Sequence, residues 1–369
     1  MHKRFRDYHY QVGSLPTGPQ NALSDVAGVL VGHCSRIEGQ GDLVSGDGPI
    51  RTGVTLIRPH GGNLFQEKVP AAVYTINGFG KAAGFEQIRE LGLLETPIAL
   101  TNTLNVGKVS DALVSLMIEQ NPTLGITSGT VNPVVGECHD GFLNDIQGRH
   151  IGLTEVQQAY QNASDTVLEG NVGGGVGTQC YQFKGGIGTA SRLILDKKHQ
   201  SQPFTVGVLV QTNFGLRHEL QILGVPVGQH LSEQHLPEVG GGSVMIILAT
   251  DAPLNQRQLE RLARRVPFGL ARTGTVCHDG SGDFVIAFST AYTIPHERDF
   301  WLREQPYFME SGRDMDRFFR AVVEAVEEAV YNALFAAQTL EGRDGNRVFA
   351  LPIEETLALL KRYNRHPGR

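Results

Sequence analysis

Short runs of apolar and β-branched residues recur along the chain, and most of them are apolar on both faces. They lie at residues 53–57, 71–76, 98–101, 205–211, 244–250 and 284–290. A strand that is covered on both faces has no polar face, so these runs predict buried central strands.

Helical periodicity appears between these runs, at residues 111–119, 252–265 and 314–338. In the second segment, Asp251 is expected to be the N-cap and Pro253 to fall in the tolerant first turn. Strands and helices interleave, with no linker-like stretch and no internal repeat at the common periods. This order predicts a layered α/β architecture in a single compact domain. The expected apolar stripe of the last helix is Phe318, Val322, Ala325, Val326, Ala329, Ala333 and Phe335.

Charge and cysteine usage limit the class of partner and the compartment. The chain has 32 basic and 38 acidic residues and no long basic block, which argues against binding nucleic acid or an anionic membrane. The four cysteines are far apart and lack a CxxC spacing, so we expect free thiols in a reducing compartment.

The start of the chain lacks the apolar stretch of about 7–15 residues found in signal peptides. No apolar run reaches the roughly 18 residues of a membrane span, and we expect a cytoplasmic protein.

Glycine is the unusual component, with 45 residues, and its most informative cluster is Pro-Glu-Val-Gly-Gly-Gly-Ser at residues 237–243. A strand-like run begins at once after Ser243. An N–O acyl shift between Gly242 and Ser243 requires the hydroxyl to approach the preceding carbonyl, and glycine leaves room for it. Cleavage there yields an α chain (1–242) and a β chain (243–369) whose free amine, with a pKa of roughly 7.7–8.0, can act as a base. The alternative is a plain glycine-rich loop before a strand.

Two further segments carry candidate catalytic groups. Ser281 and Asp283, in Asp-Gly-Ser-Gly-Asp, face one side of an extended chain, so a hydroxyl bonded to a carboxylate can orient a nearby nucleophile. The alternative is a turn capped by Asp279. Asn213 follows a strand-like run and offers its amide as an oxyanion donor, or else forms a strand-end turn.

Residues 135–145 gather Glu137, His139 and two aspartates in one loop. No second cluster with ligand spacing accompanies them, so we predict no metal site, and Glu137 is the candidate for binding a substrate ammonium group. The glycine-rich stretches 171–178 and 184–189 match neither a phosphate-binding loop nor a dinucleotide fold. We therefore predict no cofactor, and expect backbone close to a substrate or to a neighbouring subunit.

Taken together, these segments resemble the L-aminopeptidase/D-esterase family, which also contains the β-peptidyl aminopeptidases. The resemblance runs through nearly the whole chain, including residues 21–29, 184–191 and 342–346 besides the Gly-Gly-Gly-Ser and Gly-Ser-Gly-Asp segments. It implies an αββα sandwich whose connectivity differs from that of other N-terminal-nucleophile hydrolases. It also implies a precursor that cleaves before its catalytic serine, and a homo-oligomer, a tetramer in the family.

By this resemblance Ser243 is the nucleophile, Ser281 and Asp283 support it, and Asn213 matches the oxyanion-hole residue. Two positions depart from the family pattern: Asp283 stands where members tend to have Glu, and Phe142 where some have Tyr. These departures bear on substrate preference and rate more than on the type of reaction.

The predicted function is an aminopeptidase that releases N-terminal residues from short peptides, amino-acid amides or esters. Two alternatives stay open. A self-processing acyltransferase of the ornithine acetyltransferase type is one, although that family usually cleaves before Thr and this junction has Ser243. The other is a non-catalytic binding protein with a similar fold, which an intact chain on a denaturing gel would favour.

Overall fold

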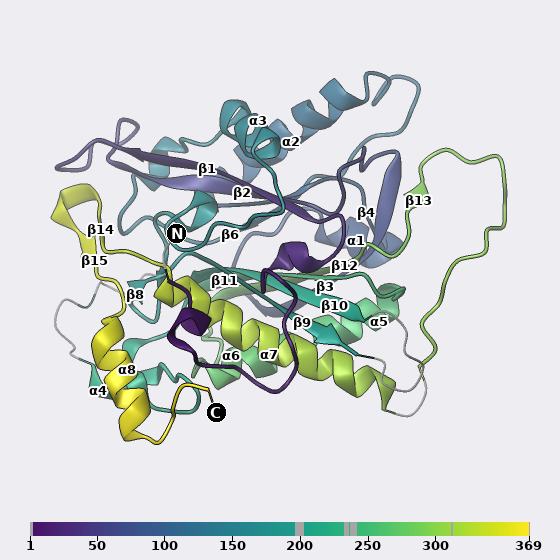
Figure 1. Cartoon of the computed structure of the whole chain (residues 1–369). Helices are drawn as coiled ribbons and strands as arrows, with labels where there is room; N and C mark the ends of the chain where they lie inside the picture. The colour runs from purple at the N-terminus through teal and green to yellow at the C-terminus, as the bar shows by residue number, and fades with distance from the viewer. Residues whose placement is uncertain (1–2, 196–202, 232–235, 237–241, 311–312, 369) are drawn as a thin grey trace.

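The computed structural model describes residues 3–195, 203–231, 236, 242–310 and 313–368. Residues 237–241 of the glycine-rich junction lie outside these ranges, whereas Gly242 and Ser243 lie inside them. The fold consists of two stacked sheets with helices on both outer faces (Figure 1).

The larger sheet has seven strands, in the order β13-β3-β12-β11-β10-β9, with β4 paired to β3. In its centre, β11 is antiparallel to β10 and parallel to β12. The strands are β3 (Glu67–Gly78), β4 (Leu93–Leu94), β9 (Ile187–Ile194), β10 (Phe204–Asn213), β11 (Ser243–Thr250), β12 (Gly282–Ser289) and β13 (Ile294–Pro295).

The smaller sheet has four strands in the order β1-β2-β5-β6. They are β1 (Leu30–Glu38), β2 (Ile50–Arg58), β5 (Ile98–Thr101) and β6 (Val134–Glu137). Two short hairpins complete the strands: β7 (Gln179–Cys180) with β8 (Phe183–Lys184), and β14 (Leu340–Glu341) with β15 (Arg347–Val348).

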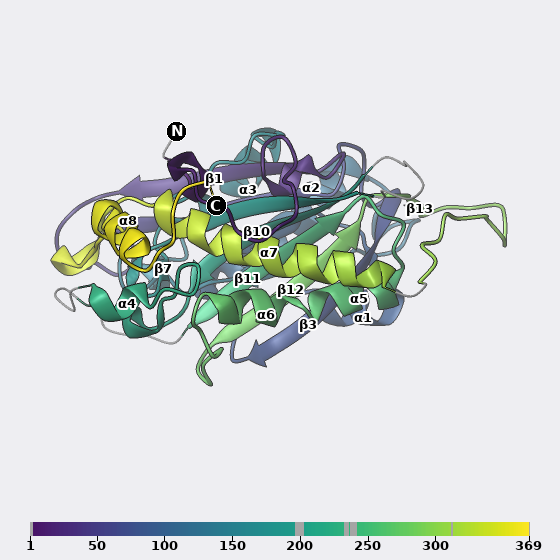
Figure 2. The same ribbon diagram turned by 60° about the horizontal axis from the view of Figure 1, so that its bottom comes forward.

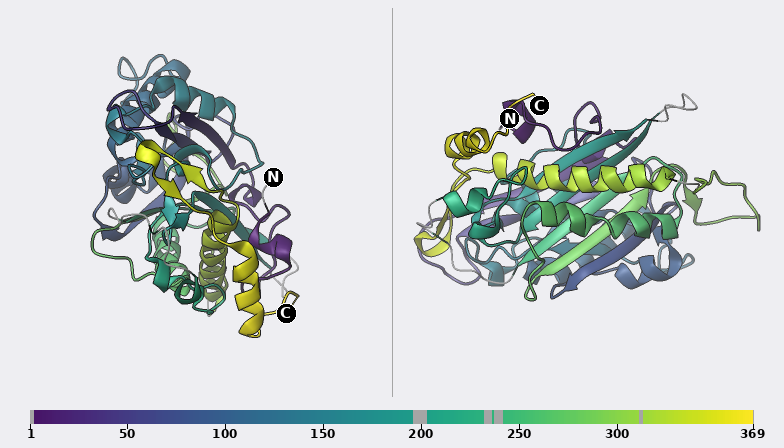
Figure 3. Two further views of the ribbon diagram at one scale, coloured as in Figure 1. Left: turned by 90° about the vertical axis from the view of Figure 1, so that its left-hand side faces the viewer. Right: turned by 90° about the horizontal axis from the view of Figure 1, so that it is seen from below.

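Helices cover the outer face of each sheet (Figures 2 and 3). The larger sheet is covered by α5 (Gln256–Ala263), α6 (Val266–Arg272) and α7 (Asp314–Phe335), and the smaller one by α2 (Val106–Gln120) and α3 (Leu153–Gln161). The remaining helices are α1 (Phe85–Leu91), α4 (Val227–His230) and α8 (Ile353–Arg362).

Strand β11 shows why the predicted strands are apolar on both faces. Val244 and Ile246 point into the core between the larger sheet and its helices, while Met245 and Ile247 point into the core between the two sheets. Each face of the strand therefore meets a different apolar layer. The αββα sandwich expected from the resemblance is confirmed.

All six predicted strands lie within observed strands or overlap them to within one residue, and α2 and α7 confirm two of the three predicted helices. The helix predicted at 252–265 is wrong in its start and its continuity. Asn255 is the N-cap, since its side chain accepts a hydrogen bond from the Gln258 N–H, whereas the Asp251 carboxylate accepts one from Thr205 N at 2.7 Å. The helical segment ends at Ala263, and a second helix begins at Val266.

The glycine-rich stretches serve close packing within this chain. A Cβ atom on Gly174 would lie 2.2 Å from Gln211 Oε1, and one on Gly188 would lie 2.0 Å from the Ala329 carbonyl oxygen of α7. Lys184 is fully buried, and its ammonium group donates to the carbonyls of Gly175, Thr178 and Gly185. These stretches therefore join elements of the sandwich, and Gly177 additionally lines the pocket described below.

A buried charge cluster links α7 to segments that precede residue 243. Glu328 accepts hydrogen bonds from Arg192 Nη2 at 2.6 Å, from Asn21 Nδ2 at 2.7 Å and from Arg6 Nη2 at 2.9 Å. Burial alone raises the pKa of Glu328, but the two arginines together hold it below its ordinary value. The cluster holds the two predicted chains together independently of their peptide bond.

We expect Glu328→Gln to lower the free energy of unfolding by about 3–5 kcal/mol, because it removes a buried carboxylate that pairs with the buried Arg192 and the partly exposed Arg6. Urea unfolding in a Ser243→Ala background, in which the predicted cleavage cannot occur, measures this. The control Glu341→Gln removes a half-exposed carboxylate paired with Arg347 and should change stability by less than about 0.5 kcal/mol. Equal effects of the two changes would contradict the role given to the cluster.

Candidate active site

The ends of three strands of the larger sheet meet at one point. In the observed register, Ser243 pairs with Asn213 of β10 on one side and with Gly282 of β12 on the other. Ser281 and Asp283 flank Gly282. The backbone pairing alone therefore brings together Asn213, Ser243, Ser281 and Asp283, which the sequence places up to 70 residues apart.

Ser243 is the first residue of β11 and is buried. Its Oγ accepts a hydrogen bond from the His139 N–H at 3.1 Å, and the carbonyl oxygen of Gly242 accepts one from the Gly282 N–H at 3.0 Å. A Cβ atom on Gly242 would lie 2.7 Å from Ser281 Oγ. The peptide bond before Ser243 thus has a polarised carbonyl, and glycine lets a second hydroxyl come close to it.

Ser281 and Asp283 are hydrogen-bonded to each other and buried. The Ser281 hydroxyl donates to Asp283 Oδ1 at 2.6 Å, so the shorter aspartate still reaches the serine. Burial raises the pKa of Asp283, against the opposing effect of hydrogen bonds from Ser281 and from the Cys277 thiol. A carboxylate that is ionised in this position holds the Ser281 hydroxyl in one orientation.

Asn77 is a positioning residue that the sequence analysis missed. Its Nδ2 donates to the carbonyl oxygens of His278, Asp279 and Ser281, and so fixes the turn before β12. It lies opposite Asp283 on β3, next to an irregularity in the pairing of the two strands. The partners are about 200 residues apart in the chain, and no local pattern reveals the contact.

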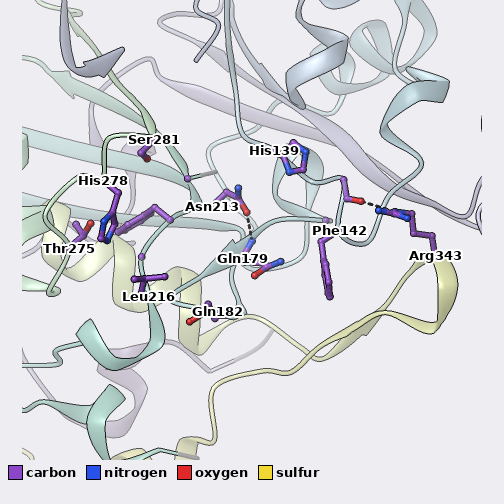
Figure 4. Close-up of a pocket in the computed structure, with 16 residues that line it drawn as sticks. His139, Phe142, Gln179, Gln182, Asn213, Leu216, Thr275, His278, Ser281 and Arg343 are labelled. Atoms are coloured by element: carbon purple, nitrogen blue, oxygen red, sulfur yellow. Dashed lines mark hydrogen bonds between the residues drawn. The ribbon is translucent and has the colours of Figure 1, made fainter. Parts of the chain in front are cut away.

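Asn213 is oriented by β7. Its Oδ1 accepts a hydrogen bond from the Gln179 N–H at 3.2 Å, which leaves Nδ2 as a donor on the pocket side (Figure 4). This orientation is the one that an oxyanion donor requires.

A pocket of about 440 Å³ opens beside these groups, a size that suits a small ligand. None of the described residues that line it is acidic. Figure 4 shows His278 and Ser281 on one side of it and Phe142 and Arg343 on the other. The lining residues are His139, Gly141, Phe142, Gly177, Gln179, Gln182, Asn213, Phe214, Gly215, Leu216, Gly242, Thr275, His278, Gly280, Ser281 and Arg343.

Glu137 lies at the end of β6, buried beneath the site and outside this lining set. Its carboxylate accepts hydrogen bonds from the Thr103 hydroxyl and from the Lys81 N–H, and burial raises its pKa. Its Oε1 is 3.3 Å from the Cβ position of Gly80, which itself lies 2.9 Å from Gly282 Cα. Glu137 is therefore next to the start of β12.

The described residues contain no group of three or more His, Cys, Asp or Glu side chains placed to hold a metal ion. Within the same ranges, no helix is both long enough and apolar enough to cross a membrane. The four cysteines are free thiols, three of them buried.

Comparison with known proteins defines the class. The model of peptidase family S58 matches residues 21–348, and the chain belongs to this family. It is 40% identical over 393 residues to the β-peptidyl aminopeptidase BapA of Sphingosinicella microcystinivorans, covering 98% of this chain and 93% of the relative.

Solved structures agree with this membership. One of them is the L-aminopeptidase D-Ala-esterase/amidase of Ochrobactrum anthropi, which is described as a prototype of the serine aminopeptidases and a variant of the Ntn hydrolase fold. It matches with a TM-score of 0.88 and 38% identity, and the match covers 98% of this chain and 99% of that one. A structure from Pyrococcus horikoshii OT3 matches with a TM-score of 0.93 and 44% identity over the whole of both chains. The chain is a serine aminopeptidase of the N-terminal-nucleophile type.

Removing the Ser281 hydroxyl tests its link to Asp283. We expect Ser281→Ala to fold but to lower kcat/KM at neutral pH by about 10- to 100-fold. Loss of a hydrogen bond to the charged form should raise the pKa of Asp283 further, so the acidic limb of the pH profile should move upward by about one pH unit. The control Ser289→Ala changes a buried serine at the other end of β12 and should leave that limb in place. If the acidic limb does not move in Ser281→Ala, the protonation state of Asp283 does not control catalysis.

Proposed function

We propose that the chain cleaves itself between Gly242 and Ser243, and that Ser243 then serves as the nucleophile that removes N-terminal residues from short peptides, amino-acid amides or esters. The observation that carries this proposal is the pair of hydrogen bonds at the junction, His139 N–H to Ser243 Oγ and Gly282 N–H to the Gly242 carbonyl oxygen.

Self-cleavage begins with attack of Ser243 Oγ on the Gly242 carbonyl carbon. The oxyanion is stabilised by the Gly282 N–H, the C–N bond breaks, and the nitrogen of Ser243 takes the hydroxyl proton. Water then hydrolyses the ester. The products are a carboxylate on Gly242 and a Ser243 that carries both a free α-amine and its hydroxyl.

Peptide turnover uses the same groups. The α-amine of Ser243, with a pKa of roughly 7.7–8.0, accepts the proton as Oγ attacks the first carbonyl of the substrate. Asn213 Nδ2 and the Gly282 N–H, which departure of Gly242 releases, stabilise the tetrahedral oxyanion. The amine product leaves with a proton, and water resolves the acyl-enzyme. Ser281 and Asp283 supply a hydroxyl hydrogen-bonded to a carboxylate beside these reacting groups.

An aminopeptidase must recognise a free ammonium group, and Glu137 is our candidate because it is a buried carboxylate beside the start of β12. Two relatives are named β-peptidyl aminopeptidases, and their name favours substrates that begin with a β-amino acid. We assign the reaction to the cytoplasm, in line with the free and mostly buried thiols.

We further propose a homo-oligomer, the tetramer implied by the family resemblance. Residues 296–310, which follow β13, extend away from the sandwich (Figure 1) and expose Trp301, Leu302 and Met309, which are 99%, 91% and 72% exposed. Large apolar side chains exposed together on one segment are typical of a protein interface.

Self-cleavage is tested on the purified protein. Mass spectrometry should find two chains, residues 1–242 and 243–369, and N-terminal sequencing of the smaller should read Ser-Val-Met-Ile-Ile. Ser243→Ala should leave one intact and inactive chain, because one hydroxyl performs both reactions. The proposal fails if the active wild-type enzyme is a single intact chain, or if Ser243→Ala hydrolyses amino-acid p-nitroanilides at the wild-type rate.

The ammonium site is tested with Glu137→Gln and a pair of substrates that differ only in N-acetylation. A hydrogen bond between an ammonium and a carboxylate contributes about 1.5–3 kcal/mol, so kcat/KM for the free amine should fall by roughly 10- to 150-fold while self-cleavage is kept. The acetylated substrate should be poor for both proteins. The control Glu155→Gln changes a carboxylate on α3 and should have no such effect. If Glu137→Gln leaves kcat/KM for the free amine unchanged, the ammonium group binds to another residue.

A further inference from the structure

Residues 342–346, Gly-Arg-Asp-Gly-Asn, carry part of the family resemblance but have no role in the mechanism above. They lie between β14 and β15 and dock onto the loop that follows β6. Arg343 N donates to the Leu143 carbonyl at 2.9 Å, Arg343 Nε to the Gly141 carbonyl at 2.7 Å, and Asn346 Nδ2 to the Phe142 carbonyl at 2.9 Å. The same loop provides the His139 N–H that bonds Ser243 Oγ, so this segment is tied to the nucleophile through one short loop.

Arg343 forms part of the pocket wall. It is the one permanently charged side chain among the described residues that line the pocket, and it is joined there by His139 and His278. Its side chain is 28% exposed, Nη1 is paired with the neighbouring Asp344, and no described residue accepts a hydrogen bond from Nη2. The charge of Arg343 also acts on His139, where it adds to burial in lowering the pKa of the imidazole. The pocket wall therefore carries one fixed cation, which is paired with Asp344 at Nη1 and faces no carboxylate among the described lining residues.

One charged group of the site lies in the pocket wall and the other lies outside it. Arg343 lies across the pocket from Ser281 (Figure 4), whereas Glu137 is next to the start of β12 and outside the lining set. A dipeptide is a zwitterion whose ammonium lies on one side of its only peptide bond and whose carboxylate lies on the other. In a longer peptide the carboxylate is displaced by up to about 3.3–3.6 Å for each added residue.

We propose that Arg343 binds the free C-terminal carboxylate of the substrate, and that the enzyme therefore prefers dipeptides to longer peptides and to amides with an uncharged leaving group. This inference rests on the proposed function. The guanidinium offers a planar set of N–H donors that suits a carboxylate. The leaving amino acid departs with its carboxylate still bound to Arg343.

The test compares alanyl-alanine with alanyl-alaninamide, which differ only in the C-terminal charge. Wild type should show kcat/KM about tenfold higher for the free dipeptide, the size of a charge-assisted hydrogen bond in a partly solvated site. Arg343→Gln keeps a donor for the loop carbonyl but loses the charge, and its ratio of the two kcat/KM values should fall to between one and about two. The control Arg347→Gln removes an equal charge from a half-exposed residue outside the pocket and should keep the wild-type ratio.

An Arg343→Gln ratio equal to that of wild type, or equal turnover of the two substrates by wild type, would overturn the inference while leaving the proposed function intact. If wild type hydrolyses neither substrate, the proposed function fails and this inference fails with it. If Arg343→Gln does not self-cleave or fold, the salt dependence of the wild-type enzyme is measured instead. Raising salt to about 1 M should lower the ratio of kcat/KM for the dipeptide to kcat/KM for the amide, because salt screens the partly exposed guanidinium. A ratio that is insensitive to salt would then count against the carboxylate site.

Discussion

The pairing of β11 between β10 and β12 is the constraint on which the rest of the site depends. Because Ser243 begins β11, its two backbone neighbours are Asn213 and Gly282, and a shift of one residue in either pairing would turn its hydroxyl to the other face of the sheet. The apolar side chains of β11 prevent such a shift, since they fill two different cores. The packing of the sandwich and the geometry around Ser243 are therefore determined together.

Burial on both faces also accounts for the electrostatics of the site. Asp283 and Glu137 are both removed from water, and burial raises both pKa values. Each is compensated by directed hydrogen bonds, from Ser281 and Cys277 to the former and from Thr103 and Lys81 to the latter. Such compensation keeps the charged forms accessible and holds the side chains in place without help from solvent.

Much of the fold could be predicted from local pattern, because runs that are apolar on both faces and a long apolar stripe report burial directly. The start of α5 could not, since Asp251 and Asn255 are equally good caps and the choice depends on the contact of Asp251 with Thr205 in another strand. At the site, residue chemistry next to strand ends marked Ser243, Ser281, Asp283 and Asn213 as candidates, and the family resemblance supplied their expected roles. Asn77 and Arg343 were missed because their roles arise from contacts across about 200 residues of chain.

We infer that the strand register makes Ser243 Oγ, freed by self-cleavage, the group that attacks the substrate carbonyl. This role can be tested by tandem mass spectrometry of enzyme quenched in acid during turnover of a slow amino-acid ester. We expect an acyl adduct on the side-chain oxygen of residue 243, in a peptide that begins at that residue. An adduct on Ser281, or a modified peptide that still contains the bond between Gly242 and Ser243, would contradict it.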